Sequence, residues 1–441
     1  MKQLDIASMI LNDILDNHTR FPDALKKVFQ SSVELRPLRG DVAGLIGCEL
    51  RHDLLFAELL KGIDGLDEKD KRIVSLGLAN VYFYRHFSLE EISNAVKGRL
   101  GEEKYNLVSS LFVEKEPGTD LVPDSVDKKS LTYLSLRYNI PEWALKIFHH
   151  FNYSICFKSA KRYARPFVTT LRLKDESLYE GYKASIDFAE TKIPYIFAYK
   201  GKTPLRKIED LKNGKLFEER PGAKDIIDQT LISAPCEALL YTGSQKTGFE
   251  KELIQTYKNT IGLNIGTKDL DAKVDVVREL KQSGLKNVNL YEAKDPLSMD
   301  AAISSQQDLV ICCPDSTNFD AISVSPDFFI QFDRDRMDEI MQGEKDALEG
   351  CSKFVEVGGK LVYCVFTLSV KEGRGTVTSF LKNHPEFELI KDKQHFPFEE
   401  AGCTYYYAIM ERKEDELTLS TPISNLQQTS LASSSSVSFG K

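Results

Sequence analysis

The sequence of 441 residues has few of the features that mark secreted, membrane-spanning or metal-binding proteins. Its 8 cysteines form no Cys-x-x-Cys pair and its 7 histidines are scattered, so no zinc site is indicated at ligand spacing. No apolar run reaches the roughly 18 residues of a membrane-spanning helix. Sparse cysteines are typical of a reducing cytoplasm, and the acidic N-terminal segment does not resemble a signal peptide. We therefore expect a cytoplasmic protein with no metal and no membrane partner.

An excess of positive charge is also missing. Lys and Arg number 58 against 66 Asp and Glu, which gives a formal net charge of −8 at pH 7. A chain with this balance is not a general nucleic-acid-binding polycation, so any RNA contact must come from a local patch. With 42% apolar and 28% charged residues, the composition is that of an ordinary globular protein with room for two to four domains.

The first part of the chain, residues 1–128, predicts an all-helical domain. Apolar residues recur at three- and four-residue spacing, and the most apolar segment, residues 72–85, is expected at the centre of the bundle. Ser88 and Glu91 have the spacing of a capping box that opens a further helix. The polar residues 114–130 contain Pro and Gly and indicate a linker.

A basic stretch follows within residues 129–215. Pro141 and Trp143 indicate a helix start, and residues 143–174 contain seven Lys or Arg and no Asp or Glu, with aromatic residues interleaved. Cations bind phosphates and flat rings stack on splayed bases, so this stretch predicts an RNA-binding patch. A solvated basic helix face above aromatic core residues is the alternative. Residues 181–215 predict short strands and turns. The candidate RNA-binding residues are Lys158, Lys161, Arg162, Arg165 and Arg172.

Strand and helix signals alternate in residues 216–412. This alternation indicates an α/β domain with a mostly parallel, doubly wound sheet, whose ligands bind beyond the carboxyl ends of the strands. Helices are predicted through 253–257, 270–283 and 337–354. From residue 413 the chain is rich in Ser, Gln and Thr, and residues 413–441 are expected to be disordered. The predicted strands are residues 238–241, 261–265, 287–291, 309–313, 360–367 and 403–410.

The most informative segment is residues 354–381. Gly358 and Gly359 precede a short apolar run at residues 361–368, which predicts a buried strand, and helical spacing resumes at Val377. Gly-Gly-x-Leu-Val-Tyr, followed by a turn and an apolar helix, resembles a late strand of the S-adenosylmethionine methyltransferase sheet. It resembles most closely the Sun/RsmB family of ribosomal-RNA cytosine-C5 methyltransferases.

This resemblance implies an architecture for residues 1–412. An all-α NusB-like domain (1–128) would be followed by a small α+β RNA-facing subdomain (129–215) and a Rossmann-like methyltransferase domain (216–412). A generic helical bundle is the alternative for the first domain. The resemblance also implies S-adenosyl-L-methionine as the cofactor and RNA, of ribosomal origin, as the partner, with no DNA partner. We expect a monomer.

The resemblance also places the cofactor-binding positions. The family turn C-A-A-P-G-G-K-T reads L-Y-T-G-S-Q-K-T here. The two glycines of the family turn are therefore replaced by residues with side chains, which can crowd the ligand. The ribose-binding acid of the family, expected at the end of the second strand, falls on Asn264, which lacks the charge of a carboxylate. An acid on the adenine side falls on Asp295. The cofactor-binding candidates are Gly243, Ser244, Gln245, Lys246, Asn264, Asp295 and Pro314.

The catalytic cysteines of the family are replaced. Its nucleophilic cysteine falls on Phe366, and its second cysteine falls on Asp315, directly after Pro314. Two thiols could substitute: Cys364, two residues before Phe366 on the same strand face and about 6.5 Å from that position by strand spacing, and Cys313, directly before Pro314. A small buried core cysteine is the alternative interpretation of Cys364. The sequence therefore predicts no catalytic residue.

Three functional hypotheses follow. The first is a divergent RNA cytosine-C5 methyltransferase whose activity is impaired or lost. The second is a non-catalytic RNA-binding or ribosome-associated module that keeps the fold and the basic patch. The third is a methyltransferase that needs no thiol and acts on another target, such as an exocyclic nitrogen. Enzymes of that kind normally have the motif Asp/Asn-Pro-Pro-Tyr/Phe, which Cys-Cys-Pro-Asp of this chain matches poorly.

Overall fold

The computed structural model describes residues 1–165, 167–232, 237–244, 247–257, 262–273, 276, 278, 287–300, 303, 306–399 and 401–414. Most of the predicted disordered tail, 413–441, therefore lies outside the described residues. In the described part, no helix combines the length and the apolarity that crossing a membrane requires.

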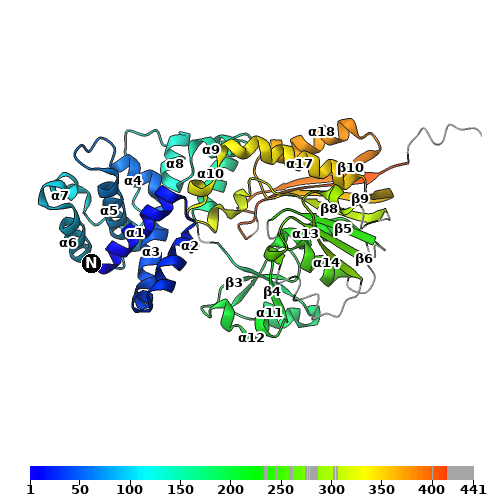
Figure 1. Ribbon diagram of the computed structural model, residues 1–441, viewed down its shortest axis with the longest axis horizontal. Helices are drawn as coiled ribbons and strands as arrows, with labels where there is room; N and C mark the ends of the chain where they lie inside the picture. Colours follow the sequence, from blue (N-terminus) through cyan, green and yellow to red (C-terminus); the bar gives the residue numbers. More distant parts are fainter. Residues whose placement is uncertain are drawn as a thin grey trace, which may run out of the picture.

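The N-terminal domain is a helical bundle, as predicted, at one end of the molecule (Figure 1). The predicted central segment forms most of α5 and a following π-turn (Asn80–Tyr84), and Val74, Leu76 and Leu78 are fully buried. The capping box of Ser88 and Glu91 is confirmed at the start of α6. The helices of this domain are α1 (Lys2–Asn17), α2 (Phe21–Ser31), α3 (Arg39–Leu50), α4 (Asp53–Leu59), α5 (Glu68–Ala79), α6 (Leu89–Leu100) and α7 (Glu102–Val108).

Three further helices connect this bundle to the rest of the molecule. Residues 112–130 form no helix or strand, in agreement with the predicted linker, and are followed by α8 (Leu131–Tyr138), α9 (Glu142–His149) and α10 (Tyr153–Tyr163). The α9 helix begins directly after Pro141, as predicted, and Trp143 packs between Phe329 and Phe332 of the α/β domain. The linker helices therefore share an apolar core with that domain.

A small antiparallel sheet lies below the main sheet in Figure 1 and has the strand order β2-β3-β1-β4. This finding confirms short strands and turns in residues 181–215. The elements are β1 (Thr170–Leu173), β2 (Phe188–Glu190), β3 (Ile196–Tyr199), β4 (Leu216–Glu218), α11 (Tyr179–Lys183) and α12 (Glu209–Lys212).

A seven-stranded sheet forms the largest domain, with the order β10-β11-β9-β8-β5-β6-β7. Strands β9, β8, β5, β6 and β7 are parallel, and β10 and β11 are antiparallel to their neighbours, which confirms the mostly parallel sheet. The strands are β5 (Glu237–Thr242), β6 (Gly262–Thr267), β7 (Val288–Glu292), β8 (Gln307–Cys313), β9 (Val355–Val365), β10 (Phe387–His395) and β11 (Tyr405–Arg412).

Helices cover both faces of this sheet. Apolar residues of α13 (Pro221–Gln229) and α14 (Phe249–Tyr257) pack on one face, and those of α17 (Met337–Ser352) and α18 (Thr376–Asn383) pack on the other. A short α16 (Phe328–Gln331) lies between β8 and α17. The predicted helix at residues 270–283 falls largely outside the described residues. The sequence prediction missed β10, ended the second strand two residues early, and began the strand that corresponds to β9 five residues late, at residue 360.

An ion pair in the interior joins the small sheet to the main domain. Arg172 of β1 is a candidate RNA-binding residue, but its side chain is 2% exposed and its Nε lies 3.0 Å from the Glu252 carboxylate of α14, which is 0% exposed. The guanidinium also contacts Glu176 at 3.1 Å. Direct RNA contact by Arg172 does not fit this position, because its charge is already neutralised inside the protein.

Arg172→Ala is expected to lower the free energy of unfolding by about 3 kcal/mol, because it leaves the Glu252 carboxylate buried without its main partner. Chemical denaturation followed by circular dichroism measures the change. Arg99→Ala removes a comparable pair with Asp5 at the surface and is the matched control, with little effect expected. A loss below about 1 kcal/mol for Arg172→Ala would contradict a stabilising role for the pair.

Candidate functional site

The candidate site lies at the carboxyl ends of β5, β6 and β8. Strand order reverses direction between β5 and β8, and doubly wound sheets bind ligands beyond this point. The segments that leave the three strands carry Gly243 and Ser244 after β5, Lys268 after β6, and Pro314 and Asp315 after β8. The structure thus brings together Gly243, Ser244 and Pro314, three of the predicted cofactor-binding residues.

Asp315 connects the ends of these three strands. Its Oδ1 accepts hydrogen bonds from the backbone N–H and the hydroxyl of Ser244, both at 2.8 Å, and its Oδ2 lies 3.3 Å from Lys268 Nζ. A Cβ on Gly243 would lie 2.3 Å from Asp315 Oδ1, so only glycine allows this approach. Sequence reasoning missed Lys268, because the predicted second strand ended too early to place this residue at the edge.

Two other predicted cofactor-binding residues lie away from this cluster. Asn264 is in the middle of β6, where Asn289 Nδ2 donates to its Oδ1 at 3.1 Å, so the expectation that it ends the strand was wrong. Asp295 follows β7 and caps a 3₁₀-helix by accepting from Ser298 N–H at 2.9 Å. Gln245 and Lys246 lie outside the described residues.

Among the described residues of this edge, Ser244 and Lys268 do not provide the contacts that S-adenosylmethionine needs. A backbone N–H of the turn after β5 should face the cofactor, but the Ser244 N–H is bonded to Asp315. The first residue after β6 is Lys268, whose ammonium cannot accept hydrogen bonds from ribose hydroxyls. Asp269 comes next and is exposed, with its N–H bonded to Thr267 Oγ1. In the described part of the chain, no group of three His, Cys, Asp or Glu side chains is arranged to hold a metal ion.

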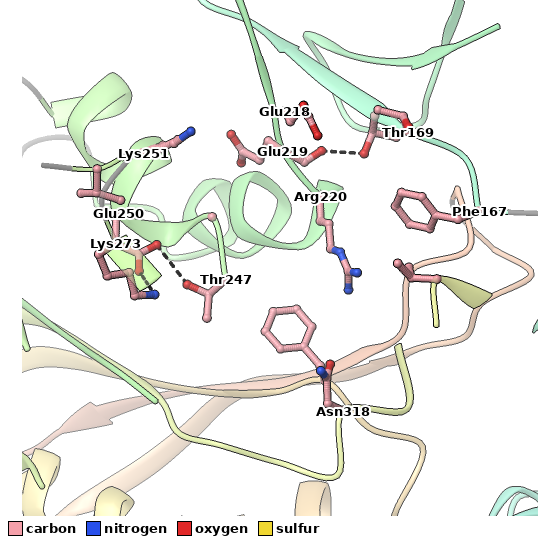
Figure 2. Close-up of a pocket in the computed structure, with 15 residues that line it drawn as sticks. Phe167, Thr169, Glu218, Glu219, Arg220, Thr247, Glu250, Lys251, Lys273 and Asn318 are labelled. Carbon is pink, nitrogen blue, oxygen red and sulfur yellow. Dashed lines mark hydrogen bonds and ion pairs between the residues drawn. The ribbon is translucent and has the colours of Figure 1, made fainter. Parts of the chain in front are cut away.

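A cavity of about 380 Å³ lies next to this edge, between the small sheet and the main sheet (Figure 2). Arg220 points into it, with Thr247 on one side, Phe167 on the other and Asn318 below. Arg220 forms an ion pair with the buried Asp320, and its guanidinium lies 5.5 Å from the centre of the Phe167 ring. The cavity therefore has an aromatic and a cationic wall.

Two glutamates modify the charge of the cavity wall. Glu250 is neutralised by Lys273 and accepts from the Thr247 hydroxyl at 3.2 Å. Burial and then the neighbouring Glu252 raise the pKa of the Glu219 carboxyl well above its ordinary value. This shift reduces the negative charge that Glu219 carries in the cavity wall, compared with an exposed glutamate.

Phe366 lines the cavity directly after the end of β9. The residues that line the cavity, within the described chain, include no cysteine. Cys364 and Cys313 are both 0% exposed and belong to the apolar core on the α13 and α14 face of the sheet. Burial raises the pKa of the Cys313 thiol well above its ordinary value, which keeps it protonated.

Glu372 fixes the loop that follows β8. Its buried carboxylate accepts hydrogen bonds from the N–H of Thr317 at 2.8 Å, and from the hydroxyls of Thr317 and Thr367 at 2.9 Å each. This network holds residues 316–318 against the end of β9. The loop therefore presents Asn318 to the cavity in a fixed position.

No family model matches the chain. It is 42% identical over 59 residues, 13% of this chain and 15% of the relative, to "Ribosomal RNA small subunit methyltransferase B" of Thermus thermophilus. The structure of PH0851 aligns over 93% of this chain and 99% of that chain, with a TM-score of 0.67 and 17% identity. The structure of NSun6 from Pyrococcus horikoshii with SFG aligns over 62% of this chain and 99% of that chain, with a TM-score of 0.52 and 12% identity.

The chain is similar in fold, and distantly in sequence, to the RsmB/Sun-type RNA m5C methyltransferases. This similarity confirms the RsmB-like arrangement of a helical domain, a small antiparallel sheet and a mostly parallel seven-stranded sheet. The sequence match spans only about 15% of the length of the curated relative. This match is too short to assign an activity, a substrate or a partner to the present chain.

Within this RsmB-like fold, α10 carries most of the predicted RNA-binding residues. Lys158, Lys161 and Arg165 are exposed, whereas Arg162 is half-buried and donates to the carbonyl oxygen of Ala401 at 3.3 Å. Lys158 and Lys161 lie one turn apart on the helix, and Arg165 follows in the same direction. The chain then continues to Phe167 in the cavity wall. The exposed cations thus precede a residue of the cavity wall along the chain, with Arg165 two positions before Phe167.

Proposed function

We propose that this protein binds single-stranded RNA, of ribosomal origin, with the exposed cations of α10 and the adjoining cavity, and does not methylate cytosine C5. The observation that carries the proposal is the combination of the exposed cations Lys158, Lys161 and Arg165 on and after α10 with a phenylalanine, Phe366, in the cavity wall. The cations supply phosphate contacts, and the aromatic wall offers a surface for a splayed base.

The thiol-dependent reaction needs a cysteine thiolate, and the described residues that line this cavity include no cysteine. In that reaction a thiolate forms a bond to C6 of cytosine, and the displaced electron pair makes C5 nucleophilic toward a methyl group. The Phe366 ring has no lone pair to donate. Cys364 is enclosed in the apolar core, and a misplacement of even about 1 Å costs much of a catalytic rate.

The proposal also holds that S-adenosylmethionine is not bound. Asp315 satisfies the hydrogen-bonding groups of Ser244 that a ligand would otherwise use, and Lys268 compensates the charge of Asp315. These contacts support the proposal, because Ser244, Lys268 and Asp315 satisfy each other's hydrogen-bonding groups and charges. The residues that would face a cofactor in the family instead connect β5, β6 and β8.

The class of RNA follows from the relatives. The curated protein of Thermus thermophilus is named for small-subunit ribosomal RNA, so fragments of that RNA are the first ligands to test. A cavity of about 380 Å³ is of a size that suits one splayed base, and splayed bases occur in single-stranded segments, which favours these as ligands. A monomer in solution stays our prediction.

Titration of the purified wild-type protein into fluorescein-labelled RNA, followed by fluorescence anisotropy, tests the proposal. Single-stranded fragments are expected to bind with a Kd of about 10 µM or lower in about 0.1 M salt. The same sequence in a duplex is expected to bind at least about tenfold more weakly, because its bases are not available for stacking. Equal affinity for the single strand and the duplex would contradict a role of the cavity in binding a base. The absence of RNA binding would exclude the whole proposal.

A further inference from the structure

The loop between β10 and β11 presents two stacked phenylalanine rings beside α10. The rings of Phe396 and Phe398 are nearly parallel, with an interplanar angle of 3° and centroids 5.5 Å apart. Phe398 is 36% exposed, whereas Phe396 is half-buried and makes a T-shaped contact with Phe151 of the segment before α10. The exposed ring therefore lies above a supporting ring that is anchored in the protein.

Hydrogen bonds hold residues 396–399 of this loop in a turn. The Phe396 N–H donates to the Glu399 carboxylate at 2.9 Å, and the Glu399 N–H donates to the Phe396 carbonyl oxygen at 3.0 Å. Pro397 between the two rings is buried. Arg162 of α10 donates to the Ala401 carbonyl oxygen, which ties the loop to the basic helix. A ring held in this way loses little conformational freedom when a ligand stacks on it.

A lysine of α10 lies over the exposed ring, and a second one follows on the same helix. Lys158 Nζ lies 5.6 Å from the centre of the Phe398 ring, and Lys161 lies one helical turn further along α10. Among the described residues of the loop, Glu399 is an exposed carboxylate that accepts a hydrogen bond from the Phe396 N–H, and Glu400 lies outside the described residues. A flat apolar surface beside exposed lysines matches a single-stranded nucleic acid, in which bases alternate with phosphates.

We propose that Phe398 stacks on a base of single-stranded RNA while Lys158 and Lys161 bind the neighbouring phosphates. The proposal rests on the RNA-binding function proposed above and adds a second base contact, outside the cavity. Every base has a flat face, so this contact is expected to be tolerant of sequence. The β10–β11 loop thereby becomes part of the RNA-binding surface together with α10.

The test compares Phe398→Ala with the wild type in the anisotropy titration. Loss of one base–aromatic stack is expected to raise the Kd by about 5- to 150-fold. The dependence of the Kd on salt concentration should stay unchanged, because no phosphate contact is removed. Phe398→Trp should keep the wild-type affinity, and Phe398→Leu, which keeps an apolar side chain without the flat face, should behave like Phe398→Ala.

Ile390→Ala is the matched control, since Ile390 is a similarly exposed apolar residue on the edge strand β10. Its affinity for RNA should equal that of the wild type. A wild-type Kd in Phe398→Ala would overturn this inference and leave the RNA-binding function intact. Failure of the wild-type protein to bind RNA would instead overturn the proposed function, so the two failures are distinguishable.

Discussion

Neutralising three exposed cations, in the variant Lys158→Gln/Lys161→Gln/Arg165→Gln, is expected to raise the Kd for single-stranded RNA by roughly a hundredfold in about 0.1 M salt. Each phosphate contact with a single strand releases about 0.7 of a counterion, which contributes about 0.7 logarithmic units of affinity at this salt concentration. Three lost contacts therefore sum to about two logarithmic units. The slope of log affinity against log salt should become shallower by about 2.

The matched control replaces three exposed lysines of α17, the residue after it and α18, in the variant Lys345→Gln/Lys353→Gln/Lys382→Gln. It has the same change in net charge, so it separates the effect of the cations on and after α10 from that of the total charge. The control should bind RNA as the wild type does. An equal loss in both variants would contradict a binding site at α10 and indicate non-specific attraction.

Calorimetric titration with S-adenosylmethionine is expected to give no saturable heat, which corresponds to a Kd above about 1 mM. The physical reason is the contact of Asp315 with Ser244 and Lys268, which occupies the hydrogen-bonding groups at the carboxyl edge. Incubation with ribosomal RNA and methyl-labelled S-adenosylmethionine should likewise transfer no label.

Asp315→Ala removes the carboxylate and leaves Gly243 and Ser244 in place, which makes it the informative variant for the same titration. Weak binding that is present in Asp315→Ala and absent in the wild type would identify the Asp315 contacts as the cause. One-to-one binding to the wild type with a Kd below about 100 µM would contradict the account. It would also direct attention to Asp269 as an acceptor for the ribose hydroxyls.

Much of the fold could be predicted from the sequence, because apolar periodicity reports which faces are buried. The helices of residues 1–128 and the run at 361–368 follow directly from that signal. The edge strand β10 was missed because it pairs on one side only, and between Phe387 and His395 it has mostly exposed, polar residues. A strand of this kind lacks the apolar pattern on which such predictions depend.

The candidate site could be predicted only in part. The sequence placed Phe366, Pro314 and Asp315 on one edge of the sheet, because parallel strands end together. The contact between Asp315 and Lys268 joins residues 47 positions apart, and no local pattern contains it. Arg172 was assigned to RNA because it belongs to a cationic stretch, but local composition does not report which way a strand residue points. Its buried partner, Glu252, lies 80 positions further along the chain.

The salt dependence of wild-type binding to single-stranded RNA tests the central claim most directly. The account predicts a Kd of about 10 µM or lower in about 0.1 M salt, and a slope of log affinity against log salt of about −2 or steeper. This slope corresponds to the three exposed cations of α10 and the segment after it. No binding, or an affinity that does not change with salt, would contradict an RNA-binding function for this protein.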